Sequence, residues 1–419
     1  MPFDQMPSLE LPDEKQPPPS CLRATTVMTA GEEELAVVYK KTYDFRHARP
    51  ATPSDSQPPL INDFIPYESG TPDTPSSYME TPEVIGHKTG TDLVIRGSAQ
   101  SPRPVTQTTI SVHIDSRLIH RADVLGNRYC GFVNGRLMFT PPEPFVEIPL
   151  RYENAYGGPD RLCQTEFIEQ LNQTVPAADM RRIRSIAEDL FSDATPLMYP
   201  RNRFGKGYIL EERKDIVEGR SLPNIERPEA RLTPENIIVG NPLSWYKQPL
   251  PIGLDYLDPS AFPRCAMFGL PPATIENPGP FAEVKKGYVP EDFSRGNIFT
   301  CDRENIPQLI HPDAGRCASL GLWLPFLKGH ESIRLHGMDL AHPDFEVVLP
   351  AEYPVFSISG SGSGRGAVDI KGRIYLAHIN INDHLLTLIW TARIKSPGSL
   401  DTARLMEIEN DLVLNFQKE

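Results

Sequence analysis

Hydrophobic and polar residues alternate in several short runs along the first third of the chain, and this pattern predicts β-strands. The run ELAVVYKKTYDF, residues 34–45, is rich in β-branched and aromatic side chains, which favour a strand over a helix. Asp115-Ser116 lies between two alternating runs, and Asn134-Gly135 lies where a tight hairpin turn needs positive φ, so we expect consecutive antiparallel strands. The runs between residues 91 and 140 are TDLVIRGSA, TQTTISVHID, SRLIHRADVLG and RYCGFVNGRLMFT.

A second set of strand-like runs lies between residues 331 and 394. These runs either alternate or are densely β-branched, as strands in a sheet are. They are ESIRLHGMD, FEVVLP, PVFSISG, VDIKGRIYLAHININ and HLLTLIWTARI. Asp401 then suits the N-cap of a closing helix. The apolar residues expected on that helix are Leu405, Met406, Ile408, Leu412 and Leu414.

The hydrophobic period changes between the two β regions. Residues 165–172 and 177–191 show helical spacing, which predicts a helical insertion. The span 196–312 has no regular period and is rich in Pro, Asn and Gly. Because a structureless loop of this length is uncommon in a compact domain, we expect an ordered coil-rich layer pinned by aromatic side chains. Residues 49–82 are expected to form a long surface excursion.

These elements predict a mainly β protein with α insertions (α+β), built from antiparallel sandwich or barrel-like sheets, a coil-rich central layer and a C-terminal helix. At 419 residues the chain exceeds the usual limit of about 250–300 residues for a single core. We nevertheless expect one large domain in which the two β regions pack together. The expected parts are a flexible acidic, Pro-rich segment (1–30), a first β region (31–158), a helical insertion with the coil-rich layer (159–330), and a second β region with the C-terminal helix (331–419).

The stretch PFVEIPLRYENAYGG, from Pro144 to Gly158, combines several unusual requirements. It begins as a strand and ends in two glycines that allow the backbone to adopt positive φ. Between these points stand polar groups that are costly to bury without partners. They are Arg151, Tyr152, Glu153, Asn154 and Tyr156. The stretch is either an ordinary strand with a Gly-Gly turn or a cluster that organises neighbouring loops.

Composition narrows the classes of partner. The net charge of −13 and the pI of about 5.3 argue against a protein that binds nucleic acid directly, because phosphate binding needs clustered Lys and Arg. Six scattered cysteines fit a reduced compartment. The N-terminus lacks the features of a signal peptide and no long apolar run occurs, so the prediction is a cytoplasmic protein with no membrane segment.

The residues around each candidate motif argue against a catalytic or metal-binding site. Gly360 to Ala367, GSGSGRGA, resembles a phosphate cradle, but a β-branched run follows instead of a helix, which favours a hairpin loop. Cys301, His311 and Cys317 lack the paired half-site of a zinc centre. No nucleophile elbow occurs, and we expect neither a metal nor a cofactor.

Two basic clusters are interpreted as solvated faces, although either could dock an acidic partner. They are Arg181-Arg182-Arg184 on the predicted helix and Arg201-Arg203-Lys206 in a loop.

Six ordered motifs carry a resemblance to a known family. They are KTGTDLVIRGSAQSP (88–102), Gly126-Asn127-Arg128, PFVEIPLRYENAYGG (144–158), NRFGKGY (202–208), LPNIERP (222–228) and LLTLIWTARI (385–394). In this order they resemble the DUF2169 family, which accompanies type VI secretion genes and includes effector adaptors for the VgrG spike. The likeness spans roughly residues 34–394 and is looser between residues 240 and 325.

The resemblance implies a non-enzymatic role as a cytoplasmic adaptor or chaperone. Such a protein binds an effector toxin and helps to load it onto VgrG, often with a PAAR-type tip. A charge of −13 could help to capture a basic, nuclease-type toxin. Two alternatives stay open: a hydrolase with its site in the Arg151, Glu153, Asn154 and Tyr156 cluster, or a structural accessory of the secretion apparatus.

The residues expected to organise the structure or a partner surface come from the central motifs. They are Arg151, Tyr152, Glu153, Asn154, Tyr156, Gly157, Gly158, Asn202, Gly205, Gly207, Asn224 and Glu226. No catalytic residue is assigned.

Overall fold

The computed structural model describes most of the two β regions and part of the segment between them. The described residues are 21–29, 32–67, 76–84, 90–160, 166, 169, 173, 176, 198–199, 201–240, 248–256, 299–301, 307–309, 322–358, 368–395 and 400–418. The N-terminal segment 1–20, nearly all of the predicted helical insertion and much of the coil-rich span lie outside this set.

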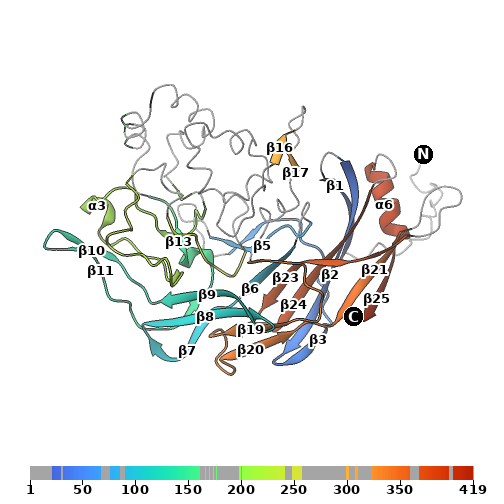
Figure 1. The fold of residues 1–419 in the computed structure, drawn as a ribbon, viewed down its shortest axis with the longest axis horizontal. Coiled ribbons are helices and arrows are strands. Elements are labelled where there is room, and N and C mark those ends of the chain that lie inside the picture. Colours follow the sequence, from blue (N-terminus) through green and yellow to red (C-terminus); the bar gives the residue numbers. More distant parts are fainter. Residues whose placement is uncertain are drawn as a thin grey trace, which may run out of the picture.

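The largest part of the described fold is one curled sheet of twelve strands, and strand is the main regular structure, which confirms the mainly β prediction (Figure 1). Its strand order is β15-β9-β8-β19-β20-β3-β2-β24-β23-β6-β18, and β1 pairs with β2 beside this path. The strands are β1 (Leu22–Thr29), β2 (Glu32–Arg46), β3 (Arg49–Pro53), β6 (Thr91–Arg96), β8 (Gln107–Ile114), β9 (Arg117–Leu125), β15 (Ile225–Glu226), β18 (Leu322–Leu324), β19 (Ser332–His336), β20 (Asp344–Val348), β23 (Arg373–Asn380) and β24 (Leu385–Lys395).

Strands from both ends of the chain alternate within this sheet. β2 pairs antiparallel with β24, and β8 pairs antiparallel with β19. β23 pairs with β6 in parallel, and β20 with β3 in parallel, so the sheet is mixed. The parallel pairs need long crossover connections, which local alternation in the sequence does not report.

The centre of the sheet is apolar on both faces, which explains the nearly continuous hydrophobic runs of β6 and β23. Leu93 and Ile95 of β6 belong to the largest core cluster, together with Trp390 of β24. Val94, between them in sequence, points to the opposite face and packs in a second cluster with Tyr256. Since neighbouring residues of a strand face opposite ways, both layers are needed to bury β6.

Two predicted hairpins are confirmed. β8 and β9 pair on either side of Asp115, which has φ of 52°. β10 (Cys130–Val133) and β11 (Arg136–Phe139) pair across Asn134 and Gly135, with φ of 51° and 77°. Smaller ladders join β7 (Ser98–Val105) to β12 (Phe145–Pro149), β4 (Ile65–Pro66) to β5 (Tyr78–Glu80), and β16 (Phe299–Cys301) to β17 (Pro307–Leu309).

The C-terminal region corrects one prediction. Helix α6 (Thr402–Asp411) begins as predicted, because the Asp401 carboxylate accepts a hydrogen bond of 2.8 Å from the backbone N–H of Arg404. The helix ends at Asp411, however, and Leu414 lies in a strand, β25 (Val413–Lys418). β25 pairs with β21 (Glu352–Ile358), and β21 also pairs with β22 (Val368–Lys371).

The antiparallel pairing of β21 and β22 agrees with the hairpin predicted around GSGSGRGA, although residues 359–367 lie outside the described set. Another expectation was wrong: the run TDLVIRGSA was expected to pair with the next run, TQTTISVHID, but β6 pairs with β23 and β18, and β8 pairs with β9 and β19. Gly97 separates β6 from β7, and the run TDLVIRGSA extends across it. At this point the polypeptide leaves the large sheet and enters the β7–β12 ladder.

Candidate functional site

The Pro144–Gly158 stretch forms a corner of the fold, beyond the end of β12. The backbone passes through a short 3-10 helix, η1 (Tyr152–Asn154), and enters β13 (Tyr156–Gly157). Gly157 and Gly158 have φ of 143° and 86°, which confirms that both glycines serve the turn. A Cβ added at Gly158 would lie 2.0 Å from the carbonyl oxygen of Gly205, so no other residue fits there without a shift of backbone.

The motif NRFGKGY packs directly against this corner. β14 (Lys206–Gly207) pairs with β13 in parallel, with Gly207 opposite Gly157. A Cβ at Gly205 would lie 2.5 Å from the carbonyl oxygen of Ala155, and Gly207 has φ of 89°. Close backbone approach therefore explains both predicted glycines.

The buried side chain of Asn202 forms hydrogen bonds with three backbone groups of the corner. Its side chain is fully buried, and its Nδ2 donates to the carbonyl oxygens of Tyr152, at 2.8 Å, and Tyr156, at 3.0 Å. Its Oδ1 accepts from the backbone N–H of Phe204 at 3.2 Å. The amide therefore fixes η1 relative to β13, and Tyr152 is itself buried.

Lys206 links two asparagines from different motifs. Its Nζ donates to Oδ1 of Asn154 at 2.9 Å and to Oδ1 of Asn224 at 2.8 Å. Asn154 in turn donates to the carbonyl oxygen of Pro149, and Asn224 to that of Leu125. Burial lowers the pKa of Lys206, although the nearby Glu153 opposes this effect. We call these three side chains, with Asn202, the corner network.

Arg151 and Glu153 connect the corner to the segment before β6. The Glu153 carboxylate accepts two hydrogen bonds of 2.7 Å from Ser77, one from its backbone N–H and one from its hydroxyl. The Arg151 guanidinium lies 3.4 Å from the centroid of the Tyr67 ring. Tyr67 donates to Asp255, a buried carboxyl whose pKa is raised by burial. Each group therefore has a partner.

Tyr156 and Glu226 face other neighbours. The Tyr156 hydroxyl donates to Oε1 of Gln248 at 3.2 Å, and burial raises its pKa well above 10. Glu226 accepts from Nη2 of Arg128 at 2.8 Å in a buried ion pair. Burial raises the pKa of Glu226, and Arg128 opposes this shift.

The predicted residues thus belong to one connected framework rather than to one reactive point. Arg151, Glu153, Asn154 and Tyr156 reach four different partners: Tyr67, Ser77, Lys206 and Gln248.

The solvated face predicted for the basic cluster Arg201-Arg203-Lys206 is wrong for two of its residues. Arg201 is buried, and Lys206 bonds inside the corner. The glycines on both sides of Lys206 were the available signal, since they bring two backbones close together. The other basic cluster, Arg181-Arg182-Arg184, lies outside the described residues.

A small cavity of about 220 Å³ opens on the outer side of the corner network. Its wall includes the exposed carboxylates of Glu143 and Glu147 and the amides of Asn127, Asn154 and Asn224. The three amide oxygens already accept hydrogen bonds within the corner. The two exposed carboxylates are therefore the groups that suit a cationic hydrogen-bond donor, such as a Lys or Arg side chain. We call this cavity the corner pocket. Within the described residues, no group of three or more His, Cys, Asp and Glu side chains could hold a metal ion.

Comparison with protein-family models gives one match. The model described as "Uncharacterized protein conserved in bacteria (DUF2169)" matches residues 30–391. The chain belongs to this family. The comparison with curated proteins gives no match, and neither does the comparison with solved structures. In the part of the sequence that the structure describes, no helix has the length and apolar character to cross a membrane.

Proposed function

We propose that this DUF2169 protein is a cytoplasmic adaptor, or chaperone, that binds a type VI secretion effector toxin and promotes its loading onto the VgrG spike. The observation that carries the proposal is the convergence of the resemblance motifs on the corner. Residues 126–128, 144–158, 202–208 and 222–228 all contribute side chains that bond to one another there. Because these motifs bond to one another, they are consistent with a common framework that holds partner surfaces in place.

The partners follow from this role and from charge. An effector toxin, VgrG and a PAAR-type tip are the expected partners, without direct nucleic acid or membrane contact. A basic, nuclease-type toxin would suit a protein with a net charge of −13. The corner pocket, with Glu143 and Glu147 on its rim, supports this as a place where a cationic side chain of the effector could bind.

The hydrolase alternative draws less support. A hydrolase needs a base, a nucleophile and a stabilising donor around one substrate atom. In the cluster assigned to it, Glu153 is engaged by Ser77, and Arg151 lies on the face of Tyr67. Such contacts favour a structural use of the cluster. The other alternative, a structural accessory of the apparatus, would require stoichiometric presence in the assembled particle.

Co-expression with the toxin and VgrG encoded beside the gene tests the proposal. We expect the three proteins to co-purify, and the toxin to fail to reach VgrG when this protein is omitted. Absence of both toxin and VgrG from the purified material would overturn the adaptor role.

A matched pair of variants tests the electrostatic part. Glu143→Lys with Glu147→Lys should weaken toxin binding, while Asp55→Lys with Asp63→Lys makes the same change of net charge at exposed positions elsewhere. A toxin complex whose rate and affinity do not respond to salt would remove the electrostatic part and leave the adaptor role standing.

A further inference from the structure

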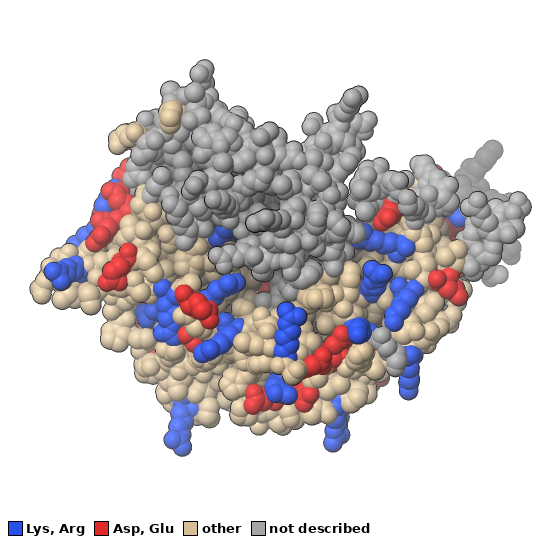
Figure 2. All heavy atoms as spheres, viewed as in Figure 1, with Lys and Arg blue, Asp and Glu red and all other residues tan. Residues whose placement is uncertain are grey.

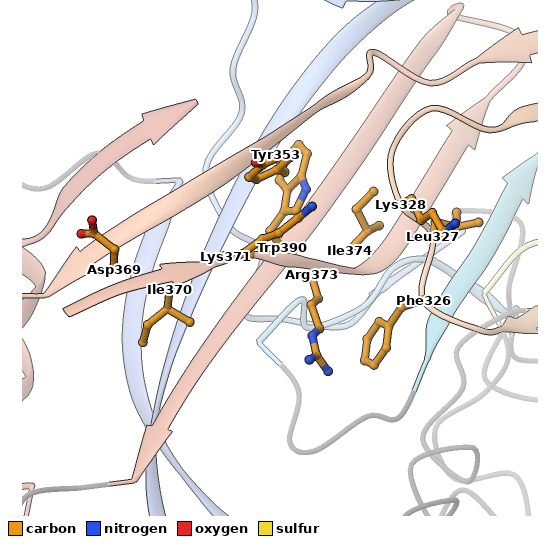
Figure 3. A pocket seen from close by; sticks show the side chains of 11 residues that line it. Phe326, Leu327, Lys328, Tyr353, Asp369, Ile370, Lys371, Arg373, Ile374 and Trp390 are labelled. Atoms are coloured by element: carbon orange, nitrogen blue, oxygen red, sulfur yellow. The ribbon is translucent and has the colours of Figure 1, made fainter. Parts of the chain in front are cut away.

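A larger pocket lies away from the corner, beside the β21–β22 hairpin (Figure 3). It has a volume of about 470 Å³, within the usual range of small-ligand sites. β22, the start of β23, β24 and the segment 326–328 form its walls. None of the corner network residues lines it, so it is a separate feature of the molecule.

The charge of this pocket is opposite to that of the whole protein. Three cationic side chains line it, Lys328, Lys371 and Arg373, against one carboxylate, Asp369. The Asp369 carboxylate already accepts a hydrogen bond of 2.5 Å from the Ser357 hydroxyl. Figure 2 shows that Lys and Arg side chains are interspersed with Asp and Glu side chains over the face in view, so the excess of positive charge is local to the pocket. A local excess of positive charge in a protein of net charge −13 selects an anionic ligand.

Aromatic rings hold two of these cations at the wall. Lys371 Nζ lies 3.6 Å from the centroid of the Tyr353 ring, and the Arg373 guanidinium carbon lies 5.5 Å from that of Phe326. Figure 3 shows Lys371 extending toward Tyr353, and Arg373 beside Phe326. The pocket therefore offers apolar ring surface next to its positive charge.

Trp390 adds a donor without an acceptor. Its side chain is fully buried and lines the pocket, and its indole Nε1 has no hydrogen-bond partner among the described residues. A buried polar group without a partner is uncommon because its desolvation is not compensated. An acceptor supplied by a ligand would satisfy the Trp390 indole.

We infer that this pocket binds a peptide carboxylate. The carboxylate would pair with Lys371 and Arg373 and accept from the Trp390 indole N–H, and the adjoining apolar group would lie on the rings of Tyr353 and Phe326. Either the free C-terminus of a polypeptide or an acidic side group supplies this chemistry. The inference does not depend on the adaptor role, since binding is a property of the isolated protein.

Calorimetry with three peptides tests the inference on the full-length protein. The first is acetyl-Ala-Ala-Phe with a free C-terminus, the second is acetyl-Ala-Glu-Phe-amide, and the third is the neutral acetyl-Ala-Ala-Phe-amide. We expect at least one acidic peptide to bind and the neutral one to bind at least tenfold more weakly. The tighter of the two acidic peptides identifies the source of the carboxylate.

Variants and one spectroscopic readout locate the site. Lys371→Met with Arg373→Met should weaken acidic-peptide binding at least tenfold, whereas Arg103→Met with Lys214→Met removes the same charges at exposed positions elsewhere and should change nothing. The Trp390 indole N–H resonance, assigned by its loss in Trp390→Phe, should shift on binding. Failure of both acidic peptides to bind at millimolar concentration, equal binding of the neutral peptide, or equal loss in both double variants would overturn the inference.

Discussion

The buried ion pair between Arg128 and Glu226 gives the sharpest test of the corner as a framework. The two residues are 7% and 4% exposed, and Nη2 of Arg128 lies 2.8 Å from Oε1 of Glu226 and 2.9 Å from the carbonyl oxygen of Pro223. Arg128→Met leaves a buried carboxylate without its main partner, and such a loss costs about 3–5 kcal/mol. Because Arg231 also lowers the pKa of Glu226 and offsets part of the charge, we expect about 3 kcal/mol.

Urea unfolding followed by circular dichroism measures this loss of unfolding free energy. The control is Arg128→Met combined with Glu226→Met, which replaces both charges by apolar groups of similar size. A buried ion pair replaced in this way is often neutral, so the double variant should recover to within about 1 kcal/mol of the parent protein. A single variant that loses less than about 1 kcal/mol would refute the reasoning that this pair is buried and coupled.

The pH dependence of the Arg128→Met variant tests whether the charge on Glu226 causes the loss of stability. Burial raises the pKa of Glu226, and Arg128 opposes the shift, so removing Arg128 raises that pKa further. A carboxyl with a raised pKa binds its proton more tightly in the folded state, and the unfolding free energy falls as pH rises above the unfolded value of about 4.3. The cost of Arg128→Met should therefore be largest at pH 8 and smaller at pH 5. An equal cost at both would contradict the charge argument.

Three further predictions concern stability. Glu153→Ala should lower the unfolding free energy by about 1–3 kcal/mol, because the buried N–H of Ser77 loses its acceptor, and under the proposed adaptor role toxin binding should fall only as far as folding does. Gly158→Ala should cost at least about 2 kcal/mol in urea unfolding, since its Cβ would strike the Gly205 carbonyl at positive φ. Burial lowers the pKa of His378 well below 6.5, so the parent protein should lose stability as pH falls below about 6.5, and His378→Phe should flatten that slope.

Local features of the fold could be predicted from the sequence because their causes are local. Alternation identified β2, β8, β9 and the strands from β19 to β24, Asn134-Gly135 identified a hairpin, and Asp401 identified a helix start. β25 was missed because Leu412 and Leu414 also fit helical spacing after Ile408. The pairing of β6 with β23 joins residues about 280 positions apart, and no periodicity specifies which distant strand becomes a neighbour.

The corner also has local features that the sequence predicts and distant contacts that it does not. The glycines and polar residues of the Pro144–Gly158 stretch indicated a turn that needs partners, which the φ values and hydrogen bonds bear out. The identities of the partners could not be predicted, because Ser77 and Lys206 come from segments 76 and 52 residues away. A charge near glycines was therefore interpreted as exposed, although the fold places Lys206 between two asparagine oxygens.

The position of the corner in the sheet determines how its variants should be interpreted. Glu226 lies in β15, which pairs with β9 at the end of the large sheet, so the ion pair with Arg128 and the corner network together fix the last strand of that sheet. Damage there affects any partner surface through folding, so under the proposed adaptor role toxin binding should follow the folded fraction. Substitution of the exposed Glu143 and Glu147 leaves these contacts intact. A variant of this second kind that stays folded and loses the toxin would therefore identify the binding surface, whereas loss in an unfolded corner variant would not.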